Sequence, residues 1–134
     1  GDHLSNRGEL PAKANYEVLK QLFLIENVGE KISEYLIGKG YEKICLYAIT
    51  DIGKALMKVL QGQKIHVECI YDRNTCLTKW NGLEVIKPTH ENLVHLQLPL
   101  LVTLVPRHNE MEEFLRNHGY KGNVLNLAEI LKLL

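Results

Sequence analysis

The residues best placed to do chemistry in this chain follow an apolar run at 43–48, where a strand-like segment gives way to a helical one. A dinucleotide-binding turn at such a place has the pattern G-x-G-x-x-G. Its first glycine forms the tight turn, the second admits pyrophosphate to the backbone, and the third lets helix pack against strand. The six residues here are Ala48, Ile49, Thr50, Asp51, Ile52 and Gly53, so only the third glycine is present.

The two substituted glycines are those that serve the turn and the phosphate. Thr50 places a β-branched side chain where phosphate oxygens would need bare backbone. Asp51, at or beside the helix N-cap, is expected to supply its carboxylate to the free amides and so compete with a bound phosphate. Two interpretations remain open: a structural turn that no longer binds a dinucleotide tightly, or an atypical nucleotide site.

Asp72 is the next candidate, because it lies 19 residues after Gly53 at the end of a second predicted strand, 64–71. An acidic residue there can accept hydrogen bonds from a ribose. Its alternative is a turn built by Asp72, Arg73 and Asn74. Arg73 could favour a 2′-phosphate, or it could be a solvated surface charge.

A third candidate group, Pro106, Arg107, His108 and Asn109, follows the most apolar segment of the chain, 98–105. If that segment is a strand beside 43–48, the group faces the Thr50 turn across the crevice at the strand ends. Arg107 could hold a phosphate or carboxylate, and His108 could bind a ligand or move a proton. The alternative is a solvent-exposed loop leading into a helix.

The other histidines do not form a metal-binding pattern. His90 and His95 are five residues apart rather than four, and no cysteine or acidic pair completes a ligand set. We therefore expect no metal site. Cys45, Cys69 and Cys76 form no CxxC pair and are expected to be reduced, structural thiols.

Composition limits the remaining function classes. The 134 residues carry 16 basic and 16 acidic side chains, and this balance does not favour nucleic-acid binding. The longest nearly uncharged apolar stretch, 96–106, is too short to cross a membrane. No signal peptide is recognisable at the polar start of the chain, so a cytoplasmic protein is expected.

The elements that must position these residues alternate between strand and helix. Residues 1–14 are expected to form a loose polar arm, and Asn15 to cap a helix that is followed by a second one from Val28 to about Gly38. Asn109 is expected to cap a helix that Gly119 ends. The predicted strands are 43–48, 64–71, 83–86 after an Asn81-Gly82 hairpin, 98–105 and 124–126; the other predicted helices are 52–60, 88–96 and 127–134.

This alternation predicts an α/β fold with an open, mainly parallel sheet, in the Rossmann-like order 3-2-1-4-5, flanked by helices. Residues 1–40 are expected to be an N-terminal arm and helices that pack on a Rossmann-like domain at 41–134. Together they would form one structural unit.

The stretch Gly40–Lys54 resembles the opening of small Rossmann-like domains of bacterial polysaccharide-biosynthesis proteins, similar to the N-terminal domain of sugar acyltransferases. Residues 70–74 resemble the strand end "FIDRN" of these domains, 80–86 their hairpin, and 101–108 their "VIVTP" strand and loop. The resemblance implies a crevice that holds a nucleotide or nucleotide-sugar. It assigns that role to Asp51, Gly53, Asp72, Arg73 and His108.

Three functions are consistent with these patterns. The first is a non-catalytic module that binds a nucleotide, a dinucleotide such as NAD(P), or a nucleotide-sugar through a degenerate phosphate loop. The second is a small enzyme that acts on a sugar or phosphorylated substrate through His108. The third is a ligand-free scaffold or dimerisation domain, with a homodimer formed through the helices at 15–38.

Overall fold

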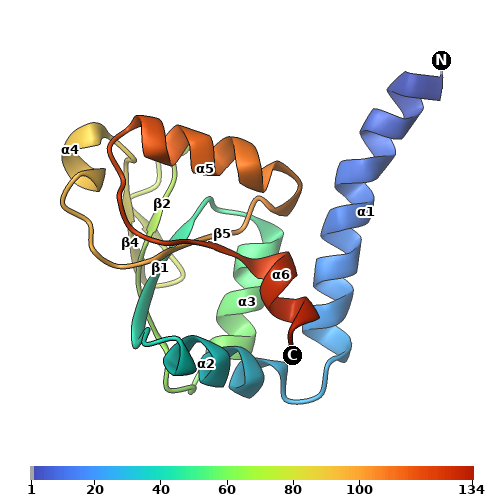
Figure 1. The fold of residues 1–134 in the computed structure, drawn as a ribbon, viewed down its shortest axis with the longest axis horizontal. Helices are drawn as coiled ribbons and strands as arrows, with labels where there is room; N and C mark the ends of the chain where they lie inside the picture. Colours follow the sequence, from blue (N-terminus) through green and yellow to red (C-terminus); the bar gives the residue numbers. More distant parts are fainter. Residues whose placement is uncertain (1) are drawn as a thin grey trace.

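A six-stranded sheet runs through the protein in the order β3-β4-β2-β1-β5-β6 (Figure 1). The computed structural model describes the backbone of residues 2–134 and the side chains of residues 12–134. Neighbouring strands are parallel except for β3 and β4, which are antiparallel, so the predicted α/β class with a mainly parallel sheet is confirmed. The strands are β1 (Lys43–Tyr47), β2 (His66–Tyr71), β3 (Lys79–Trp80), β4 (Leu83–Ile86), β5 (Leu100–Val102) and β6 (Val124–Asn126).

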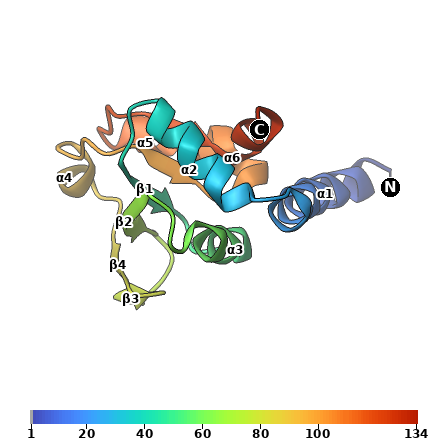
Figure 2. The same cartoon turned by 90° about the horizontal axis from the view of Figure 1, so that it is seen from below.

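Helices cover both faces of this sheet, and Figure 2 shows α3 and α4 on opposite sides of it. One buried cluster joins α1, α2, α3 and α6 to one face, and a second joins α4 and α5 to the other. The helices are α1 (Asp2–Leu24), α2 (Val28–Gly38), α3 (Asp51–Leu60), α4 (His90–Leu93), α5 (His108–Asn117) and α6 (Leu127–Lys132), with a 3₁₀ turn, η1, at Val105–Arg107. In the part of the chain described, no helix combines the length and apolar character needed to cross a bilayer.

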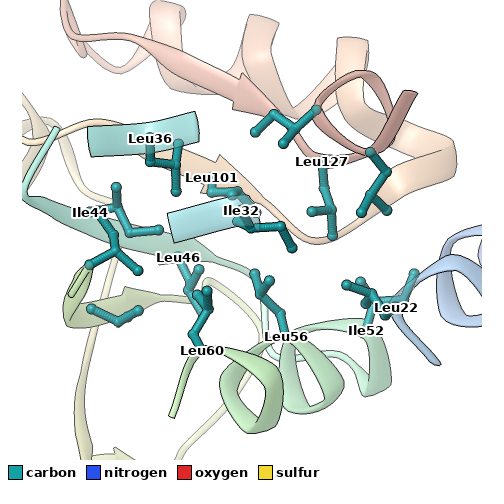
Figure 3. Packing of buried hydrophobic residues seen from close by; sticks show 14 of the residues in the cluster. Leu22, Ile32, Leu36, Ile44, Leu46, Ile52, Leu56, Leu60, Leu101 and Leu127 are labelled. Atoms are coloured by element: carbon teal, nitrogen blue, oxygen red, sulfur yellow. The ribbon is translucent and has the colours of Figure 1, made fainter. Parts of the chain in front are cut away.

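β1 is the central strand of both clusters. Its side chains alternate between the faces, with Ile44 and Leu46 in the first cluster and Cys45 and Tyr47 in the second. Figure 3 shows Ile44 and Leu46 packed beneath Leu101 and among the helices of the first face. Burial on both sides explains why this segment is a continuous apolar run rather than an alternating one.

The join between α1 and α2 lies at Asn27. Asn27 adopts φ 54°, the left-handed conformation that separates the two helices. Gly29 lies inside α2, where a Cβ on this residue would overlap the carbonyl oxygen of Val59 in α3. The glycine therefore permits the close approach of α2 to α3, which no larger residue allows.

Two helix starts differ from those predicted. Residues 2–14, expected as a loose arm, belong to α1, so Asn15 is an interior residue rather than a cap. Gly8 and Pro11 suggested a break, but local propensity is a weak prior that an anchored helix overrides. Asn109 likewise lies inside α5, which begins at His108 without a side-chain cap, because η1 leads the backbone directly into the helix.

Other local predictions are confirmed. The Asn81-Gly82 pair forms the two-residue hairpin between β3 and β4, with both residues at positive φ. Gly40 and Gly119 follow α2 and α5 at positive φ. The segment 98–105 pairs beside β1 as expected, but only Leu100–Val102 is strand, because η1 begins at Val105.

Candidate functional site

The carboxyl ends of β1, β2 and β5 meet at the point where the strand order reverses. This is the usual ligand position in open parallel α/β sheets. We call the space there the switch-point crevice. It is a pocket of about 30 Å³, lined by Tyr47, Ala48, Asp72, Arg73, Asn74, Leu104, Arg107 and Met111. That volume matches one water molecule, whereas small-molecule sites enclose roughly 300–1,000 Å³.

The turn after β1 keeps the shape of a glycine turn without its glycine. Ala48, at the first glycine position of the motif, has φ 84°. This conformation is strained for any residue that carries a Cβ. The chain therefore forms the tight turn of the motif, but the backbone at Ala48 is strained.

Thr50 stands at the second glycine position of the motif. Its Oγ1 accepts the backbone N–H of Gly53 at 2.9 Å and so caps α3. It also lies 3.0 Å from Oγ1 of Thr103, to which it donates. Thr103, which is 1% exposed, in turn donates to the carbonyl of Ala48 at 2.7 Å. This chain of hydrogen bonds ties the turn to the end of β5.

Asp51 lies beside the N-cap, as the sequence predicted, but the hydroxyl of the adjacent Thr50 accepts the helix amide that its carboxylate was expected to take. Asp51 is the first residue of α3 and is exposed. Ile52 is buried in the first cluster, and a Cβ added to Gly53 would lie 3.5 Å from the Thr103 side chain, which is ordinary contact distance. Neither Asp51 nor Ile52 lines the switch-point crevice.

Each oxygen of the Asp72 carboxylate accepts one hydrogen bond from the backbone. One oxygen accepts the N–H of Ile49 at 2.8 Å, and the other accepts the N–H of Asn74, also at 2.8 Å. The second bond is the Asx turn expected for this sequence. The first bond holds the turn after β1, so this carboxylate has a structural role whether or not it also accepts a ligand.

The two arginines of the crevice are also paired. Arg73 stacks over the ring of Phe114, 4.7 Å from its centroid. Arg107 donates two hydrogen bonds to the Glu110 carboxylate, at 2.6 and 2.9 Å, and these bonds lower the pKa of that carboxyl. Both guanidinium groups are held by neighbouring side chains rather than directed at an open pocket.

Unlike the charged groups of the crevice, the hydroxyl of Tyr47 has no hydrogen-bond partner among the described residues. Tyr47 is 2% exposed and lines the crevice. Burial raises the pKa of this phenol, so it remains a neutral donor. A buried hydroxyl without a partner is costly, and the pocket beside it has room for one water.

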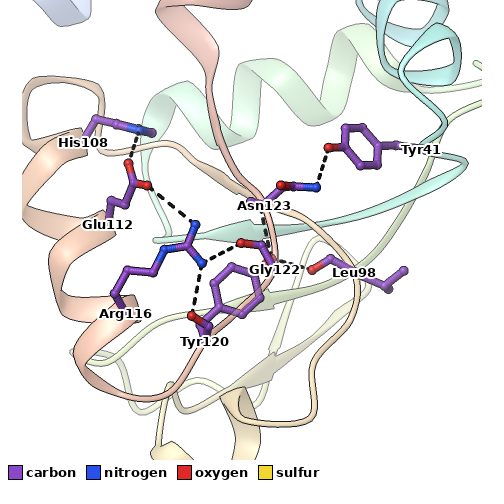
Figure 4. A network of polar contacts seen from close by, with 8 residues as sticks. All are labelled: Tyr41, Leu98, His108, Glu112, Arg116, Tyr120, Gly122 and Asn123. Atoms are coloured by element: carbon purple, nitrogen blue, oxygen red, sulfur yellow. Dashed lines mark hydrogen bonds and ion pairs between the residues drawn. The ribbon is translucent and has the colours of Figure 1, made fainter.

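His108 does not face this crevice. It lies in a separate groove of about 370 Å³ between α2, α5 and α6, which Asn109 and Glu112 also line. Its Nε2 lies 3.6 Å from Oε1 of Glu112 (Figure 4). Pro106 lies within η1 and lines neither space. The segment 106–109 therefore forms a 3₁₀ turn and the start of a helix. Arg107 lines the switch-point crevice, whereas His108 and Asn109 line the other groove.

Glu112 also takes part in a network of polar contacts around the end of α5. Its Oε2 lies 3.7 Å from Arg116, which donates to the carbonyls of Tyr120 and Gly122 (Figure 4). The Tyr120 hydroxyl donates to the carbonyl of Leu98 at 2.7 Å. These contacts fix the path of the chain between α5 and β6, and His108 stands at one end of them.

Tyr47, which lines the crevice, and Thr103, which is hydrogen-bonded to the turn after β1, were not among the sequence candidates. A signal for Thr103 was present, since it is the only polar residue between Leu98 and Val105. Tyr47 resembled an ordinary core residue of a buried strand. Comparison of the chain with family models, with curated proteins and with solved structures gives no match that identifies its relatives.

Proposed function

We propose that this chain is a non-catalytic Rossmann-like module whose nucleotide crevice is closed by its own side chains, and that it serves as a scaffold for protein assembly. One observation carries the proposal: the hydrogen-bond chain from Gly53 through Thr50 and Thr103 to Ala48 fills the phosphate position. One of the helix amides that would bind a phosphate, that of Gly53, already has an acceptor in Thr50.

The assignment to a Rossmann-like module draws on the strand order. Taken along the chain, the five parallel strands lie as β4-β2-β1-β5-β6, which is the order 3-2-1-4-5 with β3 added at the edge. The resemblance of residues 40–54 to polysaccharide-biosynthesis domains is consistent with this order. A scaffold derived from such a domain would retain the sheet while its phosphate site was lost.

Binding of a nucleotide or nucleotide-sugar is the second candidate, and one observation favours it. The unpartnered Tyr47 hydroxyl lines the same small pocket as Arg73 and Arg107. A ligand that opened the crevice would meet one hydroxyl donor and two guanidinium groups, which is chemistry suited to phosphate. An enzyme acting through His108 is less favoured, because His108 lines the other groove.

Thermal unfolding in the presence of NAD(H), NADP(H), UDP and UDP-sugars separates the two candidates. A true ligand at about 100 times its Kd stabilises a protein by about 2.7 kcal/mol. The closed module predicts no shift with any of them. A shift that Arg107→Gln abolishes and the exposed control Lys121→Gln retains would establish the second candidate instead.

A variant with Ala48→Gly and Thr50→Gly restores the first two glycines of the motif and tests the cause of the closure. If the threonine chain blocks the site, this variant gains a ligand-dependent shift that the wild type lacks. If neither protein shifts, the threonine chain is not what prevents binding, and the closed-crevice proposal loses the observation that carries it.

A further inference from the structure

The surface of α1 that faces away from the sheet is unusually apolar. Among the described residues, Tyr16, Leu19, Phe23 and Leu24 are large hydrophobic side chains that lie exposed, and Phe23 is 87% exposed. The opposite side of the helix is already buried, because Val18 and Leu22 belong to the first cluster. α1 therefore has an inner apolar face that anchors it and an outer apolar face that no described residue covers.

The outer residues form a regular stripe. Tyr16, Leu19 and Phe23 are spaced i, i+3 and i+7, which places them on one side of a helix. Beside them, Ala55 and Val59 of α3 complete an apolar groove of about 750 Å³. We call this the α1–α3 groove. Figure 1 shows α1 standing beside α3 at the edge of the protein, with the N-terminal part of α1 extending past the rest of the fold.

The charges that the described residues place on the rim of this groove are all positive. Lys20 and Lys58 line it and are exposed, and neither has an ion-pair partner in the described part of the chain. No acidic side chain among residues 12–134 lines the groove. A partner that buries the apolar stripe must therefore place negative charge beside these two lysines.

We propose that the α1–α3 groove binds an amphipathic helix of a partner protein that has large apolar residues at i, i+3 and i+7 with Asp or Glu on the flanks. A helix in an apolar groove is a common mode of peptide recognition, and Phe23 and Tyr16 supply aromatic anchors. The proposal rests on the scaffold function above and names the chemistry of its partner.

The positive rim also distinguishes this partner from a second copy of the chain. Two copies that joined their grooves about a twofold axis would gather four lysines at one interface, with no acidic residue among the described residues of either groove lining to offset them. A flat lipid surface would meet the lysines favourably but would leave the concave floor at Ala55 and Val59 unfilled. The groove shape and its charge together favour an acidic helix.

Two matched helical peptides test the proposal by fluorescence anisotropy with the full chain. Both carry Leu at i, i+3 and i+7; one has Glu on the flanks and the other has Lys. We expect the acidic peptide to bind at least about tenfold more tightly than the basic one. We expect Phe23→Ser to weaken it about tenfold and Leu77→Ser, another exposed apolar site outside the groove, to leave it unchanged.

A charge-reversed protein, Lys20→Glu with Lys58→Glu, makes the test specific. It should prefer the basic peptide, which a merely sticky apolar surface would not do. Equal binding of both peptides, or binding of neither, would overturn the proposal. So would a doubling of mass by light scattering that Phe23→Ser abolishes, or Phe23-dependent binding to vesicles of phosphatidylcholine and phosphatidylglycerol. A nucleotide-induced thermal shift would instead contradict the closed crevice and leave the peptide result to be judged separately.

Discussion

The Asp72 carboxylate accepts the backbone N–H of Ile49 at 2.8 Å, across 23 residues of sequence, and so joins the end of β2 to the turn after β1. The same carboxylate closes its own turn through the N–H of Asn74. A residue that the motif would assign to ribose is thus occupied in holding the backbone. The acidic side chain at this strand end stabilises the fold whether or not a ligand binds.

Asp72→Asn should therefore lower stability in the absence of any ligand. The amide has a single acceptor oxygen, so one of the two backbone N–H groups loses its partner. We expect a loss of about 1–2 kcal/mol in the free energy of unfolding, measured by urea denaturation. Asp51→Asn, at an exposed position on α3, should lower the free energy of unfolding by only about 0.3–0.5 kcal/mol. Equal effects of the two substitutions would contradict the structural role of Asp72.

Ala48→Gly should stabilise the protein. Glycine removes the strain at φ 84°, and part of this gain is offset by the greater freedom of glycine in the unfolded chain. The expected net gain is about 0.5–1 kcal/mol in urea denaturation. Ala55→Gly, inside α3, should have the opposite sign, with a loss of about 1 kcal/mol. A destabilised Ala48→Gly variant would show that the turn is not strained.

The Thr50–Thr103 hydrogen bond should appear as a coupling energy. Thr50→Ala removes the α3 cap and should cost about 1 kcal/mol, whereas Thr50→Ser keeps the hydroxyl and should cost less. Thr103→Val removes the donor to Ala48 at nearly constant shape. A double-mutant cycle of Thr50→Ala and Thr103→Val is expected to give about 0.5–1.5 kcal/mol of interaction. Simple additivity would mean that the two hydroxyls act independently.

Only one of the three thiols should react in the native protein. Cys76 is exposed, whereas Cys45 and Cys69 are buried with their sulfurs 3.3 Å apart. The hydrogen bond between them and their burial raise the pKa of Cys45, which keeps that thiol protonated and unreactive. Ellman's reagent should titrate one thiol rapidly and the other two only on unfolding. Cys76→Ser should remove the rapid phase; a rapid phase that persisted would place a second accessible thiol in the folded state.

Local signals in the sequence account for the features that were predicted correctly. Gly40, the Asn81-Gly82 pair and Gly119 each need a positive φ, and that need can be read without knowledge of the rest of the chain. The continuous apolar run of β1 likewise identifies a strand buried on both faces. These signals are sufficient for the α/β class and for most element positions.

The features that were missed depend on tertiary contacts. The hydroxyl of Thr50, which caps α3, also donates to Thr103, and only the fold brings together these two residues that are 53 positions apart. The sequence places His108 shortly after the apolar segment. The path of the chain from η1 into α5 decides which groove its ring lines, and that path cannot be read from the sequence. Adjacent residues can thus serve different sites, as Arg107 and His108 do.

The close approach of α2 and α3 at Gly29 has a consequence for how this sequence can diverge. Two positions of the glycine motif are already filled by other residues, Ala48 and Thr50. Position 29 allows no such exchange, because any side chain would overlap the Val59 carbonyl. A deep mutational scan should find this inconspicuous helix residue among the least replaceable in the chain. A glycine at this position, more than the phosphate motif, would then identify distant relatives of the fold.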